Sequence, residues 1–141
     1  MVQNLLIVVI GIIACVAAVI DWHTKILPNR LNLAIAILSI IWACYSQTVI
    51  PAEAFWVWFF VVVVHMVLVV VPPYGLGGGD LKLIAALGIT ASVESRVLTW
   101  LILSYAMASF AALVLRSGRK AKTLAFGPWL VIAWIAAFVG Q

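Results

Sequence analysis

Two aspartates, Asp21 and Asp80, are the residues of this sequence that are best placed to carry out chemistry. Asp21 ends one apolar run, and Asp80 directly precedes another. A carboxylate beside hydrocarbon is costly, so it usually has a partner or a task. The other two acidic residues, Glu53 and Glu94, fall in predicted loops, where solvation explains them. We therefore expect Asp21 and Asp80 to form a catalytic pair.

Two carboxylates that lie at one depth in a membrane can share a site. Like charges at close range cannot both ionise cheaply, so such a pair holds one proton between its members. The ionised carboxylate then accepts a proton from water, while the protonated one donates to a carbonyl oxygen and later helps an amine to leave. This chemistry requires no nucleophilic serine or cysteine, no metal ion and no cofactor. Because the pair titrates as a unit, we assign no separate roles to its members.

The residues around Asp80 suit a site that a substrate backbone approaches. Three glycines, Gly77 to Gly79, precede it and allow close contact with another chain. A helix that begins here would favour the ionised form of Asp80 through its dipole. A plain helix N-cap explains Asp80 equally well. Lys82 either acts on the carboxylates or the substrate, or extends its charge to the interface from an inner loop.

The segment after Asp21 reads as a re-entry loop without chemistry of its own. Pro28 biases Leu27 away from helix, and Asn29 suits a turn or the N-cap of a second helix. Elsewhere, His65 lies deep in an apolar run and is expected to make a helix–helix hydrogen bond rather than to relay protons. Cys15 lies within an apolar run, as Cys44 does, and both are expected to be buried and inert.

The composition indicates a lipid environment. Of 141 residues, 67% are hydrophobic and 9% are charged, whereas a soluble domain is typically about 25% charged. The mean hydropathy is +1.29. A soluble fold of this size has too much surface to hide so many apolar side chains. The net charge of +4 therefore reports loop orientation rather than nucleic-acid binding.

Six apolar segments predict an all-α bundle of six transmembrane helices that forms a single domain over residues 1–141. The runs are continuous rather than alternating, which argues against strands. At about 20 residues per span, the chain has room for these crossings and for no separate soluble domain. The segments cover residues 5–20, 31–45, 54–71, 81–91, 97–115 and 126–139.

The loop charges predict the orientation of this bundle. When loops are assigned to alternate sides, one side holds seven basic residues and the other holds only Arg96. The positive-inside rule places the basic side in the cytoplasm and both termini outside. Asp21 and Asp80 then share the cytoplasmic edge of the membrane. The basic residues on that side are Lys25, Arg30, Lys82, Arg116, Arg119, Lys120 and Lys122. The cluster from Arg116 to Lys122 can also attract anionic lipid head groups.

Three ordered elements resemble the type IV prepilin peptidase family of membrane aspartic peptidases. Asp21 followed by Leu27-Pro28-Asn29 resembles the family's D-x5-[IL]-P-N element. The residues 77–83, Gly-Gly-Gly-Asp-Leu-Lys-Leu, resemble its G-x-G-D-x-K-L element, and residues 126–129, Phe-Gly-Pro-Trp, resemble F-G-P-[FW]. All three fall at predicted cytoplasmic helix ends. The resemblance covers essentially the whole chain.

This resemblance implies a multi-pass enzyme of the bacterial inner membrane that cuts the basic leader from prepilin-like proteins at the cytoplasmic face. It implies that Asp21 and Asp80 are catalytic and that nearby residues support the site or bind substrate. It also implies a short, peptidase-only form, as in tight-adherence (Flp) pilus systems, without methyltransferase activity, and contacts with pilus-assembly machinery. The expected supporting residues are Gly77, Gly79, Lys82, Pro28 and Asn29.

Two alternatives remain open from the sequence. A related peptidase would act on another signal-bearing substrate, such as preflagellin. A membrane carrier or a non-catalytic assembly subunit is an alternative from a different class. A carrier often has repeated halves and polar residues deep in several helices, whereas this chain shows only His65 deep in a segment.

Overall fold

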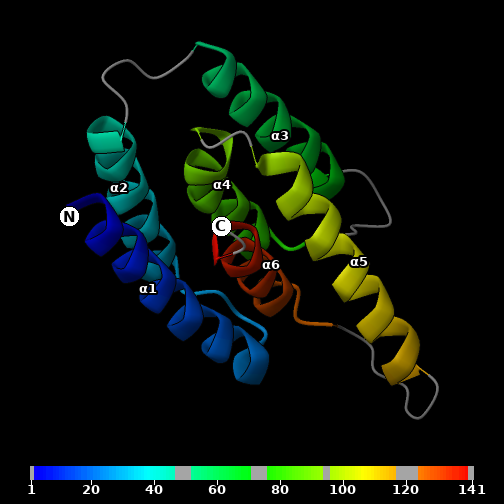
Figure 1. Ribbon diagram of the computed structural model, residues 1–141. Helices are drawn as coiled ribbons and strands as arrows, with labels where there is room; N and C mark the ends of the chain where they lie inside the picture. The colour runs from blue at the N-terminus through cyan, green and yellow to red at the C-terminus, as the bar shows by residue number, and fades with distance from the viewer. Residues whose placement is uncertain (1, 47–51, 71–75, 94–95, 117–123, 140–141) are drawn as a thin grey trace.

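A computed structural model describes residues 2–46, 52–70, 76–93, 96–116 and 124–139, and within these ranges all regular structure is helical (Figure 1). The all-α fold class predicted from the sequence is therefore confirmed. Six helices follow one another along the described chain. They are α1 (Val2–Thr24), α2 (Asn29–Ser46), α3 (Ala52–Val70), α4 (Gly78–Val93), α5 (Val97–Arg116) and α6 (Gly127–Val139).

Four of the six helices are long and apolar enough to cross a membrane, namely α1, α2, α3 and residues Val97–Val114 of α5. Helix α6 is apolar but shorter, and α4 has 16 residues. The protein is thus a multi-pass membrane protein, while six crossings and outside termini stay predictions. Glu53 lies exposed in the first turn of α3 rather than in a loop. Glu94, Arg119, Lys120 and Lys122 lie outside the described residues.

Helix α4 occupies the centre of the bundle. It packs against α2 and α3 most extensively and also contacts α5 and α6, while α1 packs on α2 and α6 (Figure 1). Half of its 16 residues are buried, including Thr90 and Ser92. Surrounding helices therefore shield most of α4, so a short segment with polar side chains is stable there.

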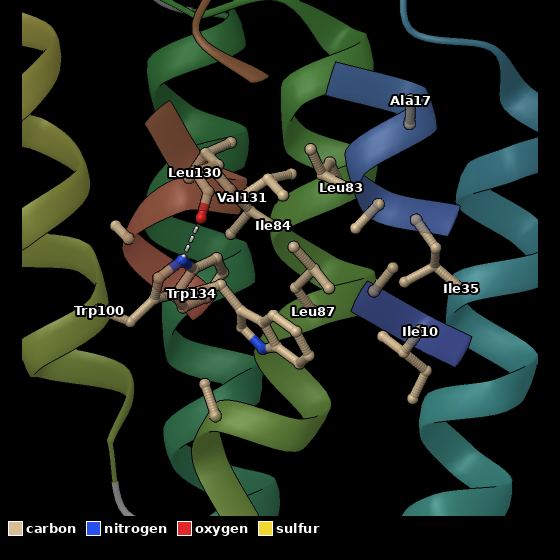
Figure 2. Close-up of a cluster of buried hydrophobic side chains, with 14 of the residues drawn as sticks. Ile10, Ala17, Ile35, Leu83, Ile84, Leu87, Trp100, Leu130, Val131 and Trp134 are labelled. Carbon is tan, nitrogen blue, oxygen red and sulfur yellow. Dashed lines mark hydrogen bonds between the residues drawn. The ribbon is translucent and has the colours of Figure 1, made fainter. Parts of the chain in front are cut away.

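Small and branched side chains, mainly from α1, α4 and α6, form the core together with three tryptophans, of which Trp100 and Trp134 make buried hydrogen bonds. Trp100 donates its indole N–H to the carbonyl of Leu130 at 2.8 Å (Figure 2). Trp134 donates to Thr90 Oγ1 at 2.9 Å. Both indoles are at most 2% exposed. A buried indole needs such an acceptor, and these bonds join α5 and α4 to α6.

The outer surface of the bundle is apolar. Large hydrophobic side chains on α1, α3 and α5 are exposed, as expected where helices face lipid. The two free cysteines are also exposed, so the expectation that Cys15 and Cys44 are buried is wrong. In a lipid-facing helix an apolar run has no single buried face, and a small apolar side chain is as stable against lipid as inside the protein.

Candidate active site

Asp21 lies in the last turns of α1, near the end of the bundle where α4 and α6 begin. Helix α1 extends past the end of the predicted apolar run to Thr24, so Asp21 is helical and its side chain is 5% exposed. Its Oδ2 accepts a hydrogen bond from the backbone N–H of Gly127 at 3.2 Å. The N-terminal end of α6 therefore holds this carboxylate through a backbone donor.

A sharp turn ends α1 and redirects the chain toward the bundle. The N–H of Lys25 donates to the carbonyl of Asp21 at 2.8 Å, and Lys25 has a φ of 57°, the left-handed conformation that commonly ends a helix. The chain then places Leu27, which is 7% exposed, against the bundle. Thr24 supports the turn with a hydrogen bond from Oγ1 to the carbonyl of Ile20.

Pro28 begins α2 in place of the expected asparagine cap. Its carbonyl accepts the N–H groups of Leu31 and Asn32 at 3.1 and 3.2 Å. Asn29 is already helical, so the N-cap role expected for it is wrong. The Oδ1 of Asn29 instead accepts a hydrogen bond from Lys82 Nζ at 2.8 Å, which connects the starts of α2 and α4. Proline lacks an N–H, so it fits the position before the first turn.

Gly79 allows the first turn of α4 to lie directly against this turn. A β-carbon built at Gly79 would lie 3.0 Å from Leu27 Cβ, closer than side chains normally pack. The carbonyl of Gly79 also accepts a hydrogen bond from Asn32 Nδ2 at 3.2 Å. A glycine at position 79 thus brings two of the three recognised sequence elements together.

Asp80 lies inside the first turn of α4, because the helix begins at Gly78. The N-cap alternative for Asp80 is therefore wrong. The carbonyl of Gly77, which is exposed, accepts the N–H of Leu81 at 3.2 Å. Asp80 lies outside the four candidate spans. Burial first, and the charge of Asp21 second, raise the pKa of Asp80 to about 6, although the backbone amide of Gly77 acts in the opposite direction.

Gly127 joins the third sequence element to the first. A β-carbon built at Gly127 would lie 2.8 Å from Asp21 Oδ2 and 3.4 Å from Leu27 Cδ1. Nearby, the rings of Trp22 and Trp129 meet edge to face, with centroids 6.5 Å apart. Residues 126–129 contain no acid–base side chain. Their contribution is a backbone donor and the space left by a missing side chain.

The comparison with protein families bears on this arrangement. Residues 8–116 match the model of the type IV leader peptidase family, which is well over half of the chain. The chain belongs to the type IV leader peptidase family. No curated protein and no solved structure gave a match. The matched range includes Asp21 and Asp80, whereas Gly127 lies beyond it.

The predicted site residues come from three helix ends that lie together, namely the end of α1 and the starts of α2 and α4. Asp21 and Asp80 interact electrostatically, and Lys82 contacts Asn29. Pro28 is half-buried and starts α2. Sequence reasoning missed Gly127 and Asn32. A glycine directly before Pro128, at an apolar helix start, was the available signal for Gly127.

His65 does not make the helix–helix hydrogen bond expected for it. Its Nδ1 bonds to the carbonyl of Val61 in its own helix at 2.7 Å, and its Nε2 has no partner within the described residues. The ring stacks on Tyr105, with centroids 5.9 Å apart, and Tyr105 contacts Phe126 at 5.1 Å. The chain therefore satisfies one imidazole nitrogen locally and uses the ring for packing between α3 and α5.

Proposed function

We propose that this protein is an aspartic endopeptidase in which Asp21 and Asp80 are the catalytic pair. The observation that supports this proposal is that Asp21, near the end of α1, raises the pKa of Asp80, at the start of α4, through its charge, while the backbone N–H of Gly127 donates a hydrogen bond to Asp21. Membership of the leader peptidase family supports proteolysis as the reaction class. Hydrolysis of this kind needs two carboxyl groups whose charges interact, so that one is ionised while the other is protonated.

The pair holds one proton in its active state. The ionised carboxylate removes a proton from a water molecule, which attacks the scissile carbonyl carbon. The protonated carboxyl donates to the carbonyl oxygen as negative charge develops there. When the tetrahedral intermediate collapses, the C–N bond breaks and the amine leaves with a proton from the pair. The N–H of Gly127 keeps Asp21 oriented throughout, as a positioning donor.

We propose a prepilin-like protein of the Flp type as the substrate and the cytoplasmic face as the side of cleavage. Lys25, Arg30 and Lys82 lie at or near the helix ends that carry the two aspartates, in agreement with a cytoplasmic position of this end. Six crossings of a bacterial inner membrane would then leave Asp80 at the cytoplasmic edge. The released pilin would pass to the pilus-assembly machinery, which makes that machinery an expected partner.

Cleavage by the purified protein tests this function. The full chain is reconstituted in vesicles of phosphatidylethanolamine and phosphatidylglycerol with a prepilin-like protein, and mass spectrometry follows the leader. One cut that releases the leader is expected. Cleavage of preflagellin alone would favour the related peptidase. Solute flux without any cleavage would favour a carrier and contradict the proposal.

The rate of cleavage should fall as the pH rises through about 6. Asp80 has a pKa of about 6, so the pair loses its shared proton above that pH and with it the acid that protonates the carbonyl oxygen. The rate should then decrease by about tenfold for each further pH unit. The pH dependence of kcat in vesicles checks this. A rate that is constant from pH 5 to above pH 8 would rule out a shared proton with this pKa.

A further inference from the structure

A groove runs between α2 and α4 and ends at Asn29 and Lys82, close in the chain to the helix ends that carry the proposed catalytic pair. Its volume is about 710 Å³. One wall is a stripe of α2 residues from Asn29 to Ala43, and the other is a stripe of α4 residues from Lys82 to Val93. Phe55, in the first turn of α3, closes the far end with its neighbours. At 1.5 Å per residue, the α2 wall is about 21 Å long, which is most of the hydrocarbon thickness of a bilayer.

The walls of the groove are apolar, and alanines make it hollow. Ala36 and Ala43 line it from α2, and Ala85 and Ala86 line it from α4. Among the described residues that line the groove, only Lys82 is charged, and it lies two residues after Asp80. A surface with this polarity pattern fits an apolar segment that becomes polar at one end.

A buried polar atom without a partner marks the same end of the groove. Asn32 is 3% exposed and lines the groove, and its Nδ2 donates to the carbonyl of Gly79. Its Oδ1 is buried and has no hydrogen-bond partner within the described residues. An unpaired buried acceptor costs free energy, so the site is complete only when a ligand supplies a donor. The other end of the same amide contacts Gly79, the residue that directly precedes Asp80.

We propose that this groove holds the apolar helical segment of the substrate, with the scissile bond at the end that Asn32 and Lys82 form. The inference rests on the proposed function and adds to it the place where the substrate is recognised. The apolar segment lies along the alanines of α2 and α4. A backbone N–H next to the scissile bond donates to Asn32 Oδ1. This contact places the scissile carbonyl beside Asp80.

A peptide fits these features better than a lipid does. An acyl chain fills the apolar walls but has no donor for Asn32 Oδ1. A phospholipid head group carries a phosphate that would pair with the Lys82 cation, so the cross-linking measurement below distinguishes lipid from peptide. The same cation repels a basic leader, so the leader leaves the groove at this end while the apolar segment stays inside. Recognition therefore depends on the apolar segment rather than on the leader.

Filling the groove tests the proposal. The variant A36W places an indole between α2 and α4, and I37W is its matched control, because Ile37 is 49% exposed and does not line the groove. Two substrates are compared, a full-length prepilin-like protein and a peptide cut short within its apolar segment. In A36W the ratio of kcat/KM for the full-length substrate to that for the peptide should fall about tenfold, through KM. In I37W the ratio should equal that of the wild type.

A photo-cross-linking amino acid provides a second measurement that does not depend on cleavage. Placed at Leu33, which is exposed and lines the groove, it should label the apolar segment of the full-length substrate. Placed at Ile37, it should label lipid. Labelling at Leu33 without cleavage would support the groove while contradicting the proposed peptidase. Cleavage with only lipid labelled at Leu33, or with unchanged ratios in A36W, would overturn the groove and leave the peptidase standing.

Discussion

Replacing either Asp21 or Asp80 by asparagine should lower the rate of substrate cleavage by about 10²–10⁴-fold, the usual contribution of general acid–base catalysis. Asparagine keeps the shape of the side chain, and in the Asp21 variant its carbonyl oxygen can still accept the N–H of Gly127. The amide neither accepts a proton from water nor donates one to a leaving amine as a carboxyl does. The measurement is leader release over time in vesicles that contain each purified variant.

The double variant should be no slower than the slower single variant, because the two carboxylates act as one unit. The thermal stability of the Asp80→Asn variant should be equal to that of the wild type or higher. When both carboxyls are ionised, two like charges lie near each other. The Asp80→Asn substitution removes the free-energy cost of burying the Asp80 charge and its repulsion by Asp21. A variant that cleaves at nearly the wild-type rate, or one that loses activity only because it unfolds, would contradict the proposed pair.

The common end of the bundle for Asp21 and Asp80 could be anticipated because helices that cross a membrane alternate in direction. Asp21 follows the first apolar run and Asp80 precedes the fourth, so an even number of crossings separates them. Loop charge then indicates the side. Neither argument uses the lateral arrangement of the helices. For that reason the sequence predicted that the two carboxylates share one end of the bundle, and membership of the family supports the reaction class.

The contacts within the site depend on lateral packing and could not be predicted. In a lipid-facing bundle the apolar runs have no clear buried side, so periodicity does not tell which helices touch. Gly127 reaches Asp21 only because α6 packs beside α1, and Asn32 reaches Gly79 only because α2 packs beside α4. The N-cap roles that the sequence left open for Asn29 and Asp80 are wrong for a simpler reason. Both helices begin earlier than the apolar pattern does, because polar residues can occupy a first turn.

The variant Gly127→Ala should lower the rate of cleavage by about 10²-fold, the effect expected when a reacting group moves by about 1 Å. The added methyl group would lie 2.8 Å from Asp21 Oδ2 and 3.3 Å from Asp21 Cγ. At these distances the carboxylate must move and its hydrogen bond to the N–H of residue 127 lengthens. The atoms in conflict belong to the end of a side chain, so the fold tolerates the change. Steady-state kinetics in vesicles, with kcat reported separately from KM, measures the effect.

Gly78→Ala is the matched control, because no atom lies within 4 Å of a β-carbon built at Gly78. It makes the same chemical change in the glycine run beside Asp80, and its kcat should stay close to that of the wild type. Equal losses in both variants would mean that glycine is needed at these positions for backbone freedom. A loss confined to Gly127→Ala, at unchanged melting temperature, follows only if the space beside Asp21 is what the third sequence element provides. In that case Gly127, which has no side chain and no reactive group, controls the geometry of the proposed acid–base pair.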